Sequence, residues 1–93
     1  MTVGILKLTI FIHDSNSLKE KRMVLHSLKA KIRNSFNVAV TQIDEEDKWQ
    51  MAILAIVGVE RDRKTINSTL SKISDFIRES RHLDLINEEM ELI

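Results

Sequence analysis

Residues 49–59 read Trp49-Gln50-Met51-Ala52-Ile53-Leu54-Ala55-Ile56-Val57-Gly58-Val59. Apolar residues occupy most odd and most even positions of this run, which is typical of a strand at the centre of a sheet with both sides covered. An acidic turn at 44–47 comes before it, and a shorter β-prone segment, 38–43, precedes that turn. The three segments together predict a β-hairpin.

Two helices and two more strands are predicted around this hairpin. Residues 3–12 are rich in apolar and β-branched side chains and predict a strand, and residues 85–93 predict the last strand. A capping box at 17–20 begins a helix that runs to about Ser35. Apolar residues at helical spacing predict a second helix over 62–81.

The resulting element order is βαββαβ, the split βαβ arrangement of ferredoxin-like folds. Right-handed crossovers place the strands in the spatial order 4-1-3-2, in a four-stranded antiparallel sheet with both helices on one face. We therefore predict an α+β fold and expect residues 1–93 to form a single domain, because no linker or low-complexity segment interrupts the chain.

Composition excludes several classes of protein. The 14 Lys and Arg balance 14 Asp and Glu, and 43% hydrophobic with 30% charged residues is typical of a folded chain. The absence of Cys rules out disulfides and thiolate metal sites. No apolar run is long enough to cross a membrane, and the first residues do not resemble a signal peptide. We expect a cytoplasmic protein with no membrane partner.

Enzyme motifs are missing from the sequence. The two glycines, Gly4 and Gly58, lie in predicted strands, so no glycine-rich loop can cradle a phosphate. No metal-ligand spacing is recognisable, and the acidic turn lacks the EF-hand pattern and is expected to be a solvated hairpin turn. His13, Asp14 and His82 are expected at one end of the sheet, as solvated residues or, less favoured, as metal ligands. We predict no cofactor, no resident metal and no catalytic residues.

A row of basic side chains is the first candidate surface. At 100° per residue, five of them fall within one narrow arc of the first helix: Lys19, Arg22, His26, Lys29 and Arg33. Like charges at these spacings destabilise a helix by roughly 0.2–0.5 kcal/mol per pair. We interpret this cationic stripe as a contact for RNA phosphates, without DNA specificity; the alternative is a solubilising face whose aliphatic stems cover the core edge.

The sheet face opposite the helices is the second candidate surface. Its predicted residues on the first and third strands are mainly apolar: Ile5, Lys7, Phe11, Trp49, Met51, Ile53 and Ala55. A second copy of the chain is the simplest cover for such a face, and a monomer with a modest exposed patch is the alternative. Base stacking on this sheet is not expected, because its central positions are aliphatic.

Four segments of the chain look familiar together: Thr2-Val3-Gly4, Ser17-Leu18-Lys19-Glu20-Lys21-Arg22, Phe36-Asn37-Val38-Ala39-Val40 and Asp47-Lys48-Trp49-Gln50. They resemble the YlxP-like family of small bacterial proteins, whose function is unknown. The resemblance implies a ferredoxin-like fold and a bacterial cytosolic protein. It also implies a gene that often lies among genes for transcription termination, translation initiation and ribosome maturation, and it carries over no catalytic residues.

These observations give two functional hypotheses. The first is a non-enzymatic accessory protein that contacts RNA or a ribonucleoprotein through the cationic stripe. The alternative is a homodimeric module that pairs through the open sheet face and binds a protein or senses a small ligand, which rests on fold analogy alone.

Overall fold

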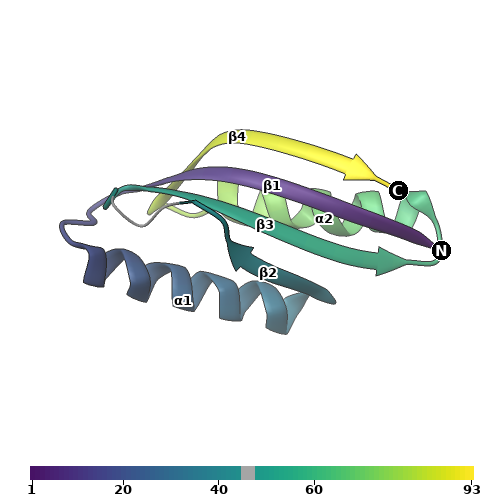
Figure 1. The fold of residues 1–93 in the computed structure, drawn as a ribbon, viewed down its shortest axis with the longest axis horizontal. Helices are drawn as coiled ribbons and strands as arrows, with labels where there is room; N and C mark the ends of the chain where they lie inside the picture. Colours follow the sequence, from purple (N-terminus) through teal and green to yellow (C-terminus); the bar gives the residue numbers. More distant parts are fainter. Residues whose placement is uncertain (45–47) are drawn as a thin grey trace.

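The computed structural model describes residues 1–44 and 48–93. Their elements follow one another in the predicted order: β1 (Thr2–Ile12), α1 (Leu18–Ser35), β2 (Val38–Gln42), β3 (Met51–Glu60), α2 (Arg63–Arg78) and β4 (Leu83–Leu92). The strands form one antiparallel sheet in the order β2-β3-β1-β4 (Figure 1). The predicted ferredoxin-like fold, with sheet order 4-1-3-2, is confirmed.

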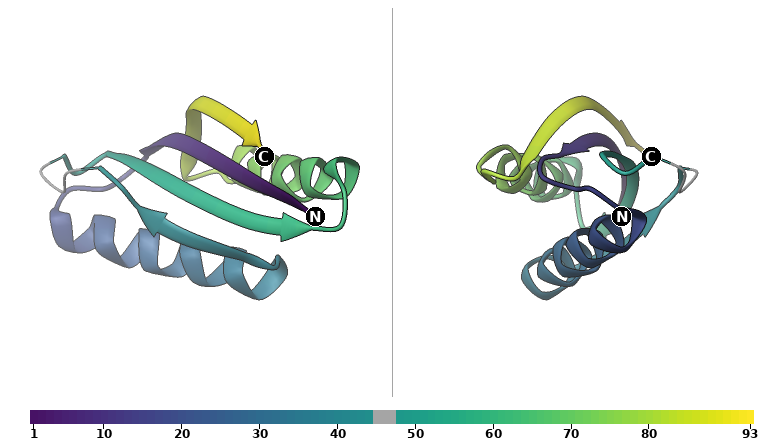
Figure 2. Two further views of the ribbon diagram at one scale, coloured as in Figure 1. Left: turned by 45° about the vertical axis from the view of Figure 1, so that its right-hand side comes forward. Right: turned by 90° about the vertical axis from the view of Figure 1, so that its left-hand side faces the viewer.

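Both helices cover the same face of the sheet (Figure 2). α1 packs over the edge strand β2, whereas α2 packs over β1, β3 and β4. The even positions of β1 point into this layer and are almost fully buried, as are Ala52, Leu54 and Ile56 of β3. The odd positions of both strands therefore form the open face.

The ends of several elements differ from the prediction. Trp49 lies in a bend before β3, α2 ends at Arg78, and β4 begins at Leu83. Regular alternation along the last strand predicts that Ile86 shares one side with Met90 and Leu92, and this prediction is wrong at Ile86. A β-bulge opposite β1 leaves this residue without a partner, and its side chain is 56% exposed.

The two glycines have a packing role in the sheet. Gly4 and Gly58 are directly paired between β1 and β3, beneath the first turns of α2. A Cβ atom on Gly4 would lie 2.6 Å from the Ile66 side chain, which is too close for a real contact. Glycine at these positions lets α2 approach the sheet.

A polar contact also joins α2 to β4. The buried Ser74 hydroxyl donates a hydrogen bond of 3.0 Å to Glu88 Oε1, and the Arg78 guanidinium pairs with the other oxygen of that carboxylate. Glu88 therefore faces the helix layer, unlike the solvent-facing Glu89 beside it.

A buried ammonium group holds α1 to the β2–β3 connection. The Lys21 side chain is 2% exposed, and its Nζ donates a 2.7 Å hydrogen bond to the Lys48 carbonyl oxygen. Asp44 Oδ2 lies 3.4 Å from the same Nζ, while Asp44 Oδ1 accepts a 2.8 Å hydrogen bond from the Ile53 N–H. We call Lys21, Asp44, Lys48 and Ile53 together the lysine clamp.

The lysine clamp corrects one expectation about the acidic turn. The Asp44 side chain is 14% exposed and paired, rather than solvated. Its position is explained by the need of a buried ammonium for a counter-charge and hydrogen-bond acceptors. The rest of that turn, residues 45–47, lies outside the described residues.

Replacing the lysine of the clamp should destabilise the fold strongly. Lys21→Met keeps most of the side-chain volume but leaves the Asp44 carboxylate and the Lys48 carbonyl without this donor, so we expect a loss of about 3 kcal/mol in the free energy of unfolding. Chemical denaturation measures this quantity. Lys19→Met, at an exposed position on the same helix, should change it by less than about 0.5 kcal/mol. Equal effects of the two variants would contradict the assignment.

Candidate functional site

The cationic stripe runs along the side of α1 that faces the β2 edge of the sheet. Four of its residues each follow a buried residue of the helix by one position, which places the stripe about 100° from the core side. Arg33 shows the direction, because its Nη2 donates a 3.0 Å hydrogen bond to the Val40 carbonyl oxygen of β2. Lys29 is half-buried, and Lys19, Arg22, His26 and Arg33 are exposed.

The carboxylate nearest the stripe in sequence is already engaged. Ser17 Oγ accepts a 3.1 Å hydrogen bond from the Glu20 N–H, which confirms Ser17 as the N-cap. Glu20 Oε2 accepts a 2.7 Å bond from the Asn16 N–H, one residue before the N–H that a capping box would use. Within the described residues, the side chains of Lys19, His26 and Lys29 make no hydrogen bond or ion pair, whereas Arg22 is partnered. The structure thus brings the five predicted residues together on one side of α1.

Two carboxyl groups have lowered pKa values. Burial raises the pKa of Asp44, whereas the hydrogen bond from the Ile53 N–H and the charge of Lys21 lower it. The lowering effects are larger in sum, so the pKa lies below the ordinary value of 3.8. The exposed Asp62 is the N-cap of α2, and the hydrogen bond from the Thr65 N–H lowers its pKa. Both groups stabilise the fold in their ionised forms.

The histidines at one end of the sheet are close along the backbone, as predicted. The His13 N–H donates a 2.9 Å hydrogen bond to the His82 carbonyl oxygen. The imidazole of His13, however, pairs with Asp84, with 2.9 Å between Nε2 and Oδ2, rather than with Asp14. No group of three side chains suited to hold a metal ion occurs in the described part of the chain.

The open sheet face carries the residues predicted for it. Ile5, Phe11, Met51, Ile53 and Ala55 are half-buried on this face. Trp49 lies just before β3 and is 53% exposed.

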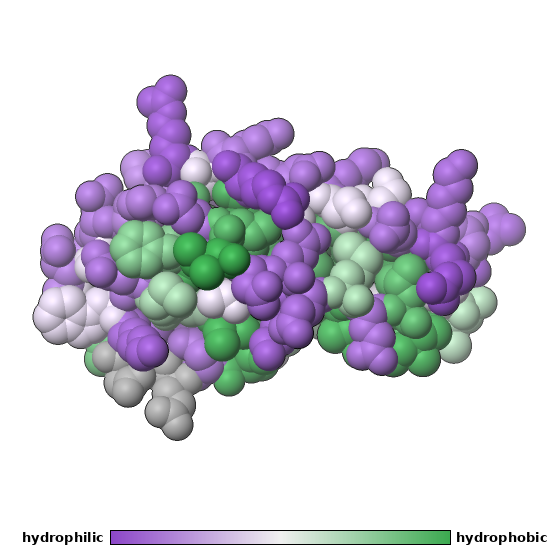
Figure 3. Space-filling model, turned by 90° about the horizontal axis from the view of Figure 1, so that it is seen from above, coloured by the Kyte–Doolittle hydropathy of each residue, from purple (hydrophilic) through white to green (hydrophobic). Residues whose placement is uncertain are grey.

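The apolar surface of the open face is interrupted at its centre. Lys7 lies between Ala55 of β3 and Glu89 of β4, and its Nζ is 3.5 Å from Glu89 Oε2. Figure 3 accordingly shows two apolar areas with polar side chains between them. At the far end, Val57 and Val59 are also exposed, so this face offers two apolar areas rather than one.

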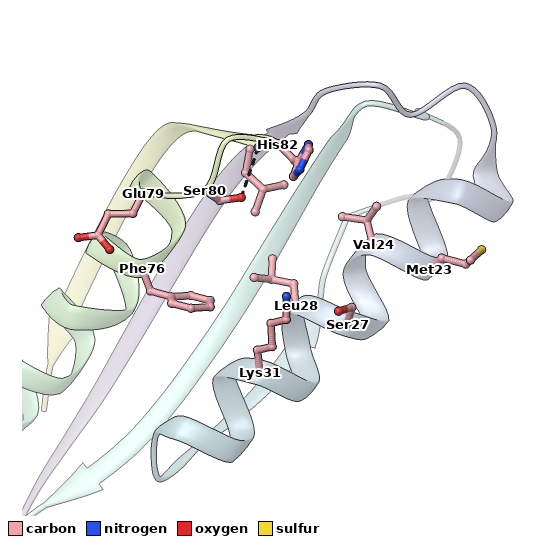
Figure 4. A pocket seen from close by; sticks show the side chains of 10 residues that line it. Met23, Val24, Ser27, Leu28, Lys31, Phe76, Glu79, Ser80 and His82 are labelled. Carbon is pink, nitrogen blue, oxygen red and sulfur yellow. Dashed lines mark hydrogen bonds between the residues drawn. The ribbon is translucent and has the colours of Figure 1, made fainter.

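A groove between the helices was missed by sequence reasoning. α1 and α2 each pack on the sheet and have little contact with one another, and a cavity of about 560 Å³ lies between them. Its apolar lining comes from both helices and from β4: Met23, Val24, Leu28, Phe76 and Leu83 (Figure 4). Met23 and Phe76 are apolar residues on the exposed sides of amphipathic helices, and this departure from a polar outer side is the signal that the sequence offers.

Neither helix in the described residues is long and apolar enough to cross a membrane.

The fold and these surfaces define an α+β domain of the ferredoxin-like class. A family model described as "Protein of unknown function (DUF503)" matches residues 3–90, and the chain belongs to this family. It is 33% identical over 75 residues to the "Uncharacterized protein YlxP" of Bacillus subtilis (strain 168), a match that covers 81% of this chain and 82% of the relative. The resemblance to the YlxP-like family is confirmed.

The solved structures that match this chain have little sequence identity to it. The de novo designed protein Foldit4 matches with a TM-score of 0.51 and 15% identity, over 100% of this chain and 94% of the other. SnoaB, a cofactor-independent oxygenase from Streptomyces nogalater, matches with a TM-score of 0.48 and 15% identity, over 99% and 90% of the two chains. At this identity the match to Foldit4 shows the fold alone.

Acid should destabilise the fold by protonating Asp44 and Asp62, the two carboxyl groups with lowered pKa values. Because their folded-state pKa values lie below 3.8, their contribution is complete above pH 3.8 and is lost as the pH falls through the folded-state values. We expect the variant Asp44→Asn/Asp62→Asn to be less stable than the parent at neutral pH, with a smaller further loss in acid. Urea denaturation across this pH range measures both quantities. Parallel stability curves would contradict the prediction.

Proposed function

We propose that this protein binds RNA or a ribonucleoprotein through phosphate contacts made by the cationic stripe of α1. The observation that carries the proposal is the stripe itself: five basic residues on one side of one helix, with no carboxylate on α1 after Glu20. Such an arrangement disfavours the isolated helix and is compensated when an anion binds along it.

The dimensions of the stripe suit a polyanion. From Lys19 to Arg33 the helix rises by about 21 Å at 1.5 Å per residue. A row of this length faces several successive phosphates rather than a single small anion. Side chains that meet phosphates position a nucleic acid without reading its bases, so we propose little sequence preference.

The family supports the same class of partner. Resemblance to the YlxP-like family implies a gene that often lies among genes for translation initiation and ribosome maturation.

The separation of charge on the molecule also favours an oriented approach of the protein to a polyanion. The stripe lies along the β2 edge, and exposed Asp84, Glu89 and Glu91 lie on β4 at the opposite edge of the sheet.

Removing two lysines of the stripe should weaken RNA binding and its salt dependence. Lys19→Gln/Lys29→Gln leaves Arg22 and Arg33 in place, because these arginines already have partners within the fold. With a slope of about 0.7 per single-strand phosphate contact, the plot of log affinity against log salt should become shallower by about 1.4. Fluorescence anisotropy with labelled total RNA, and sedimentation with ribosomal particles, at two salt concentrations test this.

The matched control removes the same charge from the other helix. Lys64→Gln/Lys72→Gln changes two exposed lysines of α2 and should leave the slope as in the parent. Unchanged RNA affinity in the stripe variant, or an equal loss in both variants, would refute the proposal.

We propose as a second candidate that the protein is a homodimeric interaction module joined through its open sheet face. The exposure of Trp49, Val57 and Val59 supports it, since these large apolar side chains extend over both areas of the face. Pairing by a two-fold axis would bury both areas at once. Sensing of a small ligand by such a dimer is a further proposal that rests on fold analogy.

A charge placed in the open face should dissociate such a dimer. Met51→Lys puts an ammonium among half-buried apolar side chains, so the species seen by light scattering at high micromolar concentration should change from dimer to monomer. Ser68→Lys adds the same charge at an exposed position of α2 and should leave the dimer intact. A parent protein that is monomeric at that concentration rules out this interface, and a dimer that survives Met51→Lys places it elsewhere.

A further inference from the structure

The groove between the helices has the size and lining of a small-molecule site. Its volume of about 560 Å³ lies within the range of about 300–1,000 Å³ usual for ligand pockets. Val24 and Leu28 approach from α1 and Phe76 from α2, as Figure 4 shows, and Leu83 also lines the groove. Leu28 and Leu83 are nearly buried, so the interior of the groove is apolar.

Two large apolar side chains are exposed at the walls of this groove. Met23 is 64% exposed and Phe76 is 36% exposed, and each lies at the solvent-facing margin of its helix. An apolar molecule seated between the helices would shield the Phe76 ring from water, whereas the Met23 side chain points outward at the margin (Figure 4). The lining of the groove therefore suits a ligand with an apolar part.

The charges at the rim specify the polar part of that ligand. Lys31 extends from α1 with its amino group toward the groove, and His82 lies at one end of it, whereas the Glu79 carboxylate points away (Figure 4). Within the described residues, the Lys31 and His82 side chains make no hydrogen bond or ion pair. The polar groups that face the groove are therefore cationic or neutral, and they complement an anion.

We propose that the groove binds a small amphiphile with an apolar tail and one carboxylate. The tail packs between Leu28 and Phe76, and the carboxylate accepts hydrogen bonds from Lys31. This site is separate from the cationic stripe, because Lys31 lies about 200° around the helix from Lys29. The proposal is therefore independent of RNA binding, and either can fail alone.

Three probes with eight carbons each separate the roles of tail and charge. Octanoate, 1-octanol and octylamine, each below its micelle concentration, are titrated into the full chain while amide and methyl NMR signals are followed. We expect saturable shifts at Val24, Leu28 and Phe76, with octanoate bound most tightly and octylamine most weakly. No saturable shifts at these residues with millimolar octanoate, or shifts confined to the open sheet face, would overturn the proposal.

Two variants assign the contacts. Lys31→Gln should weaken octanoate by about threefold, as expected for one exposed ion pair, and leave octanol unchanged. Phe76→Ala should weaken octanoate and octanol alike, by roughly fivefold. Lys72→Gln, at an exposed position of α2 outside the groove, is the charge control and should have no effect. If Lys31→Gln and Lys72→Gln alter octanoate binding equally, the assigned carboxylate contact is wrong. If Phe76→Ala does not fold, the comparison of Lys31→Gln with Lys72→Gln alone tests the site.

Discussion

The arrangement of the helix layer depends on one buried ammonium group. Lys21 cannot remain charged inside the protein without acceptors, and the Lys48 carbonyl and the Asp44 carboxylate supply them from the two ends of the β2–β3 connection. Together with the buried Leu25, Leu28 and Ile32 of the same helix, this pairing determines the rotation of α1 about its axis. With Lys21 facing inward, the stripe must face the β2 edge and Lys31 must face the other helix.

The fold could be predicted because its signals are local. The capping box, the alternation of β1 and the two-sided apolar character of β3 each follow from neighbouring residues, and all agree with one topology. The β-bulge could not be read in advance, because Leu85 and Ile86 are adjacent apolar residues and either can face the core. Only pairing with β1 decides between them.

The surfaces were predictable to different degrees for the same reason. The stripe depends on the spacing of residues within one helix, and all five fall where that spacing places them. The lysine clamp and the groove depend on distances between elements remote in sequence. In the sequence, Lys21 cannot be distinguished from the exposed basic residues beside it, because its partners Lys48 and Asp44 are remote in the chain. The groove exists because the two helices pack on one sheet with little contact between them.

The bond between Arg33 and the Val40 carbonyl has a consequence for self-association. β2 is an edge strand of only five residues, and such strands expose backbone groups that can recruit another chain into a continuous cross-β stack. The Arg33 guanidinium donates a hydrogen bond to the outward-facing Val40 carbonyl oxygen in the middle of that edge, and it places a positive charge there. With Arg33 bonded to it, this carbonyl oxygen is less available to the N–H groups of a strand from another chain.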